Sequence, residues 1–127
     1  DKNNPSVLNY LGYMLADRGL KLDEALTMIK KAVESDPING AFLDSLGWVY
    51  FKMNKLDLAE QFLKRAVAFA ATNATMHHHL GDLYYKTGRF QEAQASWTKG
   101  LQYADEPEEA GRIREKLEQV KSQAAIR

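Results

Sequence analysis

The chain has 127 residues, 45% of them apolar, which is enough for one domain with one continuous core. Seventeen basic residues balance seventeen acidic ones, so the chain lacks the broad positive charge that non-specific binding to nucleic acid or to an anionic membrane requires. No apolar stretch approaches the ~20 residues that span a bilayer, so direct membrane insertion is not expected, and the lack of cysteine excludes disulfides and thiolate zinc sites.

The predicted helices come in pairs, and a Leu-Gly frame marks the first helix of each pair. Gly12, Gly47 and Gly81 each follow a leucine and lie 35 and 34 residues apart. Around each glycine, large apolar residues recur at helical spacing, and a second helical stripe follows after a short break. Self-similarity at this period indicates a stack of antiparallel helix pairs. Within one pair, Gly47 and Ala59 are predicted to let the helices cross closely, which explains a helical glycine despite its cost of about 1 kcal/mol.

The segments between the paired helices carry residues that favour sharp turns. Gly19, Asn54 and Gly88 stand where the first helices must stop, and glycine and asparagine tolerate the left-handed conformation of a helix C-cap. Asp23 and Asp57 follow, and we expect them to cap the N-termini of the second helices. One extra residue in the first of these turns accounts for the 35-residue period.

The last predicted element is a single amphipathic helix at about 107–124. Acidic residues surround Pro107, and negative charge is favourable in a first helical turn. One face of this helix is an apolar stripe, formed by Ile113, Leu117, Val120 and Ala124. The other face carries charges of both signs, as expected of a helix that covers the exposed edge of the last pair. A coiled coil or a membrane-surface segment is less favoured, because only about two heptads are present and basic residues do not dominate.

These residues closely resemble the tetratricopeptide repeat, a 34-residue helix-turn-helix unit with the signature W-x2-L-G-x2-Y…A-x3-F…P. The second pair shows the likeness well, with Leu46-Gly47-x-x-Tyr50 followed by Ala59-x-x-x-Leu63. The resemblance covers nearly the whole chain and implies an all-α fold, a right-handed α-solenoid of seven helices. In a single domain over 1–127, the implied units are three repeats at about 5–38, 39–73 and 74–106 and a capping helix at about 107–124.

The resemblance also implies where a ligand would bind. In tetratricopeptide proteins the first helices line a concave groove, through positions six and three residues before the Leu-Gly glycine and one, four and five residues after it. The residues expected to form the peptide-binding groove here are Asn9, Tyr13, Asp17, Asp44, Trp48, Phe51, Lys52, His78, Asp82, Tyr85 and Lys86. The remaining groove positions are Ser6, Ala16, Ala41 and Thr75.

Four of the groove positions are aromatic: Tyr13, Trp48, Phe51 and Tyr85. In the second pair another stripe of apolar residues already serves the packing between helices, so Trp48 and Phe51 are additional apolar surface. Aromatic residues are over-represented among binding hot spots, and we expect a peptide to bury this row. The alternative is that these rings pack against neighbouring first helices or against further repeats.

The charges of the groove suggest the character of the partner. Its three aspartates favour an apolar or aromatic protein segment that carries some basic residues. The best-known ligand of the fold is a C-terminal carboxylate, which basic and amide side chains clamp. The corresponding residues here are Asn9, Tyr13, Ser45, Thr75 and His79. None of them is a lysine or arginine, and a carboxylate needs charge-assisted donors, so a receptor for Hsp70 or Hsp90 tails is not expected.

The chain is therefore predicted to be a non-catalytic protein-protein interaction module within a larger scaffold or adaptor protein. No phosphate-binding loop, nucleophile elbow or paired metal motif occurs, so neither a cofactor nor catalysis is expected. The run His77-His78-His79 does not predict a metal site, because consecutive helical side chains point about 100° apart; we expect His77 at the core edge, His78 in the groove and His79 near solvent. One alternative is a structural spacer or self-association module, in which case the chain would form a homo-oligomer. An RNA-binding helical repeat is less favoured, since the groove offers phosphates no net attraction.

A finer likeness concerns the source. The segments LGYMLADR (11–18) and LDSLGWVY (43–50) resemble the C-terminal repeats of bacterial tetratricopeptide proteins, among them outer-membrane lipoproteins that serve as adaptors. This likeness implies a bacterial source and a periplasmic setting or a membrane anchor in an upstream region; otherwise the setting is cytoplasmic. Because the chain starts at Asp1 and enters a repeat almost at once, we expect it to be part of a longer protein.

Overall fold

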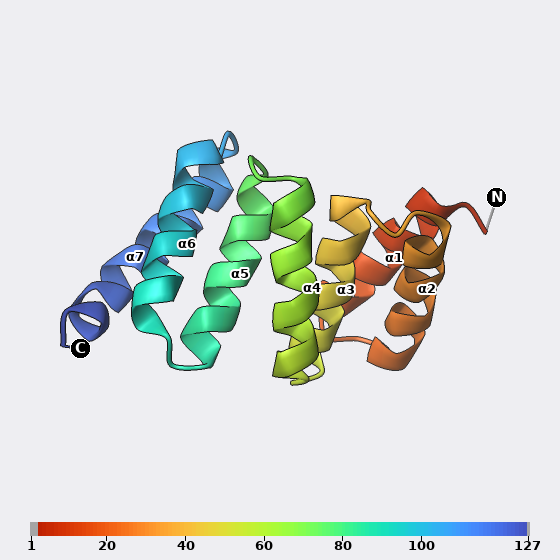
Figure 1. The fold of residues 1–127 in the computed structure, drawn as a ribbon, viewed down its shortest axis with the longest axis horizontal. Helices are drawn as coiled ribbons and strands as arrows, with labels where there is room; N and C mark the ends of the chain where they lie inside the picture. The colour runs from red at the N-terminus through yellow and green to blue at the C-terminus, as the bar shows by residue number, and fades with distance from the viewer. Residues whose placement is uncertain (1–2, 127) are drawn as a thin grey trace. The chain divides into compact units, whose positions relative to one another are not determined.

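The computed structural model describes residues 3–126, and this part of the chain is all helical, without strands. The predicted all-α fold is confirmed, and each predicted helix pair is present (Figure 1). The final helix extends two residues past its predicted end. The seven helices of the described residues are α1 (Pro5–Asp17), α2 (Leu22–Ser35), α3 (Gly40–Lys52), α4 (Leu56–Phe69), α5 (Ala74–Lys86), α6 (Phe90–Tyr103) and α7 (Pro107–Ile126).

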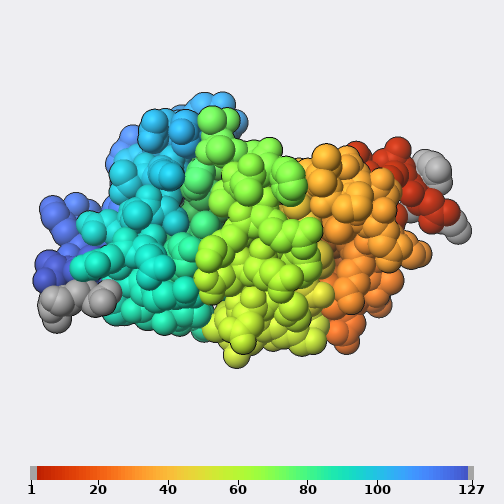
Figure 2. Space-filling model, viewed as in Figure 1, coloured from red at the N-terminus to blue at the C-terminus, as the bar shows by residue number. Residues whose placement is uncertain are grey.

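Two compact units divide the chain, the first ending at Ala70 and the second beginning at Ala71. In the first unit α1 pairs with α2 and α3 pairs with α4, while α3 also packs on both helices of the first pair. In the second unit α6 packs on α5 and on α7. Neighbouring helices within each unit are in close contact on the face that Figure 2 shows. That the two units act as one domain stays a prediction.

Each first helix begins at an asparagine cap. The side-chain oxygens of Asn4, Asn39 and Asn73 accept hydrogen bonds of 3.1–3.2 Å from the backbone N–H three residues on, which satisfies a donor that the helix itself leaves unpaired. The caps recur at intervals of 35 and 34 residues, the same period as the Leu-Gly frame, so the pattern was present in the sequence.

The predicted C-caps of the first helices are confirmed. Gly19, Asn54 and Gly88 have φ values of 70°, 63° and 78°, a left-handed conformation in which glycine and asparagine are least strained. The extra residue of the first repeat lies in the loop 18–21, where Lys21 also has a positive φ of 46°. The insertion is therefore absorbed in the turn, and both helices keep their register.

The predicted N-caps of the second helices are wrong. The N-cap residues of α2 and α4 are Lys21 and Lys55, and neither makes a side-chain cap hydrogen bond. Asp23 and Asp57 lie inside the first turn. Their carboxylates act there through the favourable interaction of negative charge with the positive end of the helix dipole.

In each of two helix pairs, a glycine of the first helix faces a large side chain sixteen residues later, which lets the paired helices approach closely. A Cβ built on Gly47 would lie 2.7 Å from Leu63 Cγ, and one built on Gly81 would lie 2.3 Å from Trp97 Cδ1. Leu63 and Trp97 are both buried. The close crossing predicted from Gly47 is thus present, and the side chain that occupies the space comes from the middle of the second helix.

Candidate functional site

In the first unit, the predicted groove residues lie on α1 and α3. Asn9, Tyr13 and Asp17 are spaced at i, i+4 and i+8 on α1, so they share one face of that helix. Tyr13 is half-buried and Asp17 is exposed. The side-chain oxygen of Asn9 is buried and accepts no hydrogen bond among the described residues. A buried acceptor without a donor is unusual in a folded protein.

Trp48 on α3 is the centre of a cluster that we call the Trp48 cluster, formed by Asp17, Trp48, Phe51 and Lys52. The Trp48 Nε1–H donates a hydrogen bond of 3.0 Å to Asp17 Oδ1. The Phe51 ring stacks on Trp48 with centroids 4.8 Å apart and planes 7° apart. Lys52 Nζ lies 5.2 Å from the centroid of the Trp48 ring, within range of a cation–π interaction. The cluster thus combines an aromatic stack with one acidic and one basic side chain.

The expectation that Trp48 offers free aromatic surface is wrong. Trp48 is only 6% exposed, because its ring packs in the first unit and its indole N–H finds an acceptor on α1. Asp44, expected as a groove acid, is also buried. The accessible members of this face are Phe51, which is half-buried, and Lys52, which is exposed. The buried Trp48 ring therefore contacts both side chains, through stacking with Phe51 and a cation–π interaction with Lys52.

In the second unit, side chains of α7 contact two of the predicted groove residues of α5, His78 and Asp82. Glu109 Oε2 lies 3.1 Å from His78 Nδ1, and Lys116 Nζ lies 2.8 Å from His78 Nε2. The same ammonium group donates to both carboxylate oxygens of Asp82 at 2.9 and 3.1 Å. Thr75 Oγ1 donates to Glu109 Oε1 at 3.0 Å. His78 and Asp82 thus belong to the packing of α7 on α5, and their expected place in an open groove is corrected.

The contacts define the protonation state of His78. Lys116 is a donor only, so His78 Nε2 must accept its hydrogen bond and carries no proton. The Nδ1–H then donates to the Glu109 carboxylate, an assignment that follows from the hydrogen-bond network. Burial lowers the pKa of His78 below 6.5, and Lys116 and His79 act in the same direction, while Asp82 and Glu109 oppose them. His78 is therefore held neutral in the folded unit.

We expect the second unit to lose stability as the pH falls below 6.5. The unfolded chain protonates His78 at its ordinary pKa of 6.5, whereas the folded protein resists until a lower pH. Between these two values the unfolded state binds more protons, so the free energy of unfolding decreases with pH. Urea midpoints followed by circular dichroism from pH 8 to pH 5 measure the effect. His78→Gln should flatten the profile, and an equally steep decline in that variant would contradict the assignment.

The other residues singled out in this unit fall into two groups. Tyr85 and Lys86, at the end of α5, are exposed, and the Tyr85 ring contacts Phe90 and Trp97. His77 is in the core, as expected, with Nε2 2.7 Å from the Ala71 carbonyl oxygen. His79, expected near solvent, is buried.

Two classes of feature are absent from the part of the chain that the structure describes. Residues 3–126 contain no group of three or more histidine, cysteine, aspartate or glutamate side chains placed to hold a metal ion. None of the helices in this range combines the length and the apolar character needed to cross a bilayer.

Comparison with known protein families gives two matches, both to models described as tetratricopeptide repeat. One covers residues 14–74 and the other residues 74–107. A curated TPR repeat-containing protein of Pseudomonas aeruginosa is 43% identical over 56 residues. That match takes in 44% of this chain and 10% of the relative, so the chain spans about a tenth of the curated protein it matches.

Solved structures share the fold at low sequence identity. The first TPR of Spaghetti (RPAP3), bound to the HSP90 peptide SRMEEVD, is 23% identical with a TM-score of 0.80, covering 98% of this chain and 96% of that chain. The Yersinia enterocolitica type III secretion chaperone SycD, in complex with a peptide of the translocator YopD, is 20% identical with a TM-score of 0.78, covering 91% of each chain. Both structures hold a peptide on a fold of this kind.

Proposed function

The chain belongs to the tetratricopeptide repeat family, and from that premise we propose that it is a non-catalytic protein-binding module. It binds a peptide or protein segment on the face of the first unit that Asn9, Tyr13, Phe51 and Lys52 share. The peptide-bound states of the RPAP3 domain and of SycD favour this use of the fold. Within a longer protein, such a module would serve as a scaffold or adaptor.

The half-buried rings of Tyr13 on α1 and Phe51 on α3 are the observation that carries the proposal. A peptide lying along this face would cover both rings and exclude water from them. Aromatic side chains that keep part of their surface accessible are common anchors in peptide recognition.

The charges of this face favour an apolar or aromatic segment without a strong preference for basic residues. Asp44 is buried and Asp82 is neutralised by Lys116, so two of the three aspartates do not face a ligand as free carboxylates. Asp17 already accepts the Trp48 indole N–H. The partner we propose therefore buries apolar side chains against Tyr13 and Phe51, with charges at its ends near Asp17 and Lys52. A bacterial periplasmic or membrane-anchored setting also stays a proposal.

Tyr13→Ala is expected to weaken binding at least tenfold, because it removes an aromatic contact at the centre of the face. The probe is a peptide selected from a random phage-displayed library on the wild-type chain, with affinity measured by fluorescence anisotropy. Tyr10→Ala is the control, because it removes the same side chain from the exposed stripe of α1 that lies next to the proposed site. Equal losses in the two variants, or no loss in Tyr13→Ala, would contradict the proposed site.

A further inference from the structure

Four polar side chains of the second unit form one hydrogen-bonded group, which we call the His78 cluster. It consists of His78 and Asp82 on α5 and of Glu109 and Lys116 on α7. Both ring nitrogens of His78 face α7: Glu109 Oε2 lies 3.1 Å from Nδ1, and Lys116 Nζ lies 2.8 Å from Nε2. The Lys116 ammonium also donates to both carboxylate oxygens of Asp82. One ammonium group thus joins two side chains of α5 to α7.

The apolar side of α7 packs on α6 by contacts of a different kind. Ile113 and Val120 are fully buried, and a Cβ built on Gly100 of α6 would lie 3.3 Å from Ile113 Cδ1. The Gln91 side chain of α6 donates a hydrogen bond of 3.4 Å to the Ala124 carbonyl oxygen. None of these five residues titrates, so a change of pH acts on the contact of α7 with α5 and leaves its contact with α6 intact.

A proton on His78 Nε2 is incompatible with the contact to Lys116. Neutral Nε2 accepts from the ammonium group, whereas both nitrogens of an imidazolium are donors, so two cations would face each other at 2.8 Å. Asp82 Oδ1 lies 4.0 Å from the same nitrogen, at i+4 on the same helix, and a small rotation of the side chains brings it within hydrogen-bond range. The Lys116 side chain is long and 33% exposed, so its ammonium can reach solvent.

We propose that uptake of one proton from solvent at His78 Nε2 transfers the Asp82 carboxylate from Lys116 to His78 and loosens α7 from α5. The imidazolium then donates to two carboxylates, Glu109 at Nδ1 and Asp82 at Nε2. Lys116 turns into solvent, and the ion pair that joined α7 to α5 becomes a pair within α5. Helix α7 keeps its apolar packing on α6 and its contact through Glu109.

The groups around His78 determine the pH at which this exchange of partners occurs. Burial is the largest influence and lowers the pKa of His78 below 6.5, so the exchange requires mildly acidic solution. From α6, the Trp97 Nε1–H donates to the His78 carbonyl oxygen and to Asp82 Oδ1, and it keeps its proton throughout. Four charged or titratable groups also act on the ring, of which the two carboxylates raise the pKa and the other two lower it: Asp82, Glu109, Lys116 and His79.

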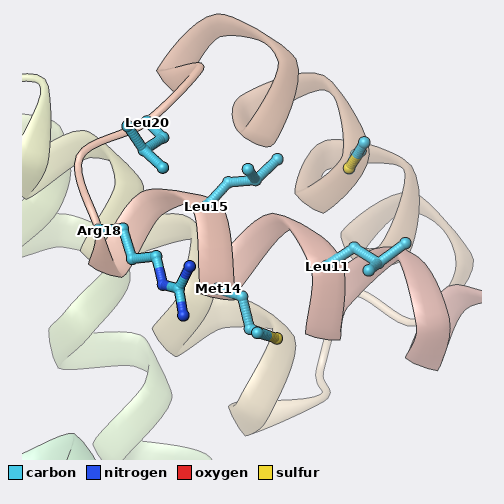
Figure 3. Close-up of a pocket in the computed structure, with 6 residues that line it drawn as sticks. Leu11, Met14, Leu15, Arg18 and Leu20 are labelled. Carbon is cyan, nitrogen blue, oxygen red and sulfur yellow. The ribbon is translucent and has the colours of Figure 1, made fainter.

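The first unit serves as an internal control, because all three histidines of the chain lie on α5. Its cavity of about 240 Å³ is lined by side chains that do not titrate between pH 8 and pH 5. Figure 3 shows that these are apolar apart from Arg18, whose guanidinium keeps its charge. A change in histidine charge therefore arises in the second unit alone.

Nuclear magnetic resonance of the native protein from pH 8 to pH 5 tests the exchange. We expect the ring Cε1–Hε1 signal of His78 and the Cε–Hε signals of Lys116 to change with one common midpoint. The signals of Lys31, which is exposed on α2, should stay fixed. Lys116 signals that do not move while His78 titrates would overturn the proposal. A His78 ring that stays neutral in every folded sample would overturn it as well.

Three variants separate the effects of the two partners on the His78 midpoint. Lys116→Met should raise it by about one pH unit, because the opposing ammonium is lost, and Asp82→Asn should lower it by about as much, because the new acceptor loses its charge. Lys121→Met is the matched control, since this side chain of α7 is 71% exposed, and it should leave the midpoint unchanged. Equal effects of the two lysine variants would contradict the role given to Lys116.

Hydrogen exchange shows whether the new pairing loosens α7. Below the His78 midpoint, we expect the protection factors of α7 amides to fall by about tenfold more than those of α5. His78→Gln has no group to protonate at this position and should remove the difference. Equal losses in α5 and α7 of the wild-type protein would disprove the loosening. None of these results bears on the binding face proposed at Tyr13 and Phe51, which belongs to the first unit.

Discussion

Replacing Trp97 with alanine is expected to destabilise the second unit by about 3–5 kcal/mol, the range typical of an aromatic residue truncated in a packed core. Trp97 is 2% exposed and fills the space that the absent side chain of Gly81 leaves. Its Nε1–H also donates to the His78 carbonyl oxygen at 3.2 Å and to Asp82 Oδ1 at 3.1 Å. The alanine variant would leave a cavity and remove the indole donor from both acceptors, of which Asp82 Oδ1 keeps its hydrogen bond from Lys116.

Trp97→Phe separates the two contributions. It keeps most of the ring volume and removes the indole N–H, so we expect a smaller loss of about 1–2 kcal/mol, as for other buried hydrogen bonds. Urea unfolding followed by circular dichroism measures both variants, and the emission of Trp48, the other tryptophan, reports on the first unit. An alanine variant as stable as the phenylalanine variant would show that ring packing contributes little.

The architecture could be predicted from the sequence because the features that determine it repeat. The Leu-Gly frame, the alanines of the second helices and the left-handed turns at Gly19, Asn54 and Gly88 are local signals, and each is reinforced at a fixed interval. A helix cap also depends on a few adjacent residues. The caps at Asn39 and Asn73 were therefore predictable from the asparagine period.

The state of the groove residues could not be predicted in the same way, because it depends on pairs far apart in the chain. The indole N–H of Trp48 meets a carboxylate 31 residues earlier in the sequence, and neither residue by itself reveals that contact. Polar residues at groove positions also do not show whether solvent, a ligand or another helix satisfies them. Burial of Trp48 and Asp44 was for this reason outside the reach of motif analysis.

One long-range signal was present in the sequence and was missed. Lys116 follows Asp82 by 34 residues, and Glu109 follows Thr75 by the same interval, and both pairs form hydrogen bonds. Helix α7 therefore continues the register of the first helices by one more period. A lysine one period after a groove aspartate is the pattern that would have predicted the ion pair between Asp82 and Lys116.

Gly81→Ala is expected to destabilise the protein by about 1–3 kcal/mol, although alanine is the better helix former by about 1 kcal/mol. The new Cβ would lie 2.3 Å from Trp97 Cδ1 and 2.4 Å from its Nε1, distances at which the indole has to move. The ring is rigid and buried, so the strain passes to the helix pair. Urea unfolding of the single variants and of the double variant with Trp97→Ala gives the coupling between the two sites.

Two controls make the same glycine-to-alanine change where no ring obstructs the new Cβ. In both, the destabilisation expected of Gly81→Ala should be absent. Gly111 lies inside α7 with nothing within 4 Å of a built Cβ, so Gly111→Ala should stabilise the protein by about 0.5–1 kcal/mol through helix propensity alone. In the Trp97→Ala background the obstructing ring is gone, so Gly81→Ala should become neutral or stabilising there. If Gly81→Ala costs the same with and without the tryptophan, the steric role of Trp97 is disproved, and the glycine is required for a property of the backbone.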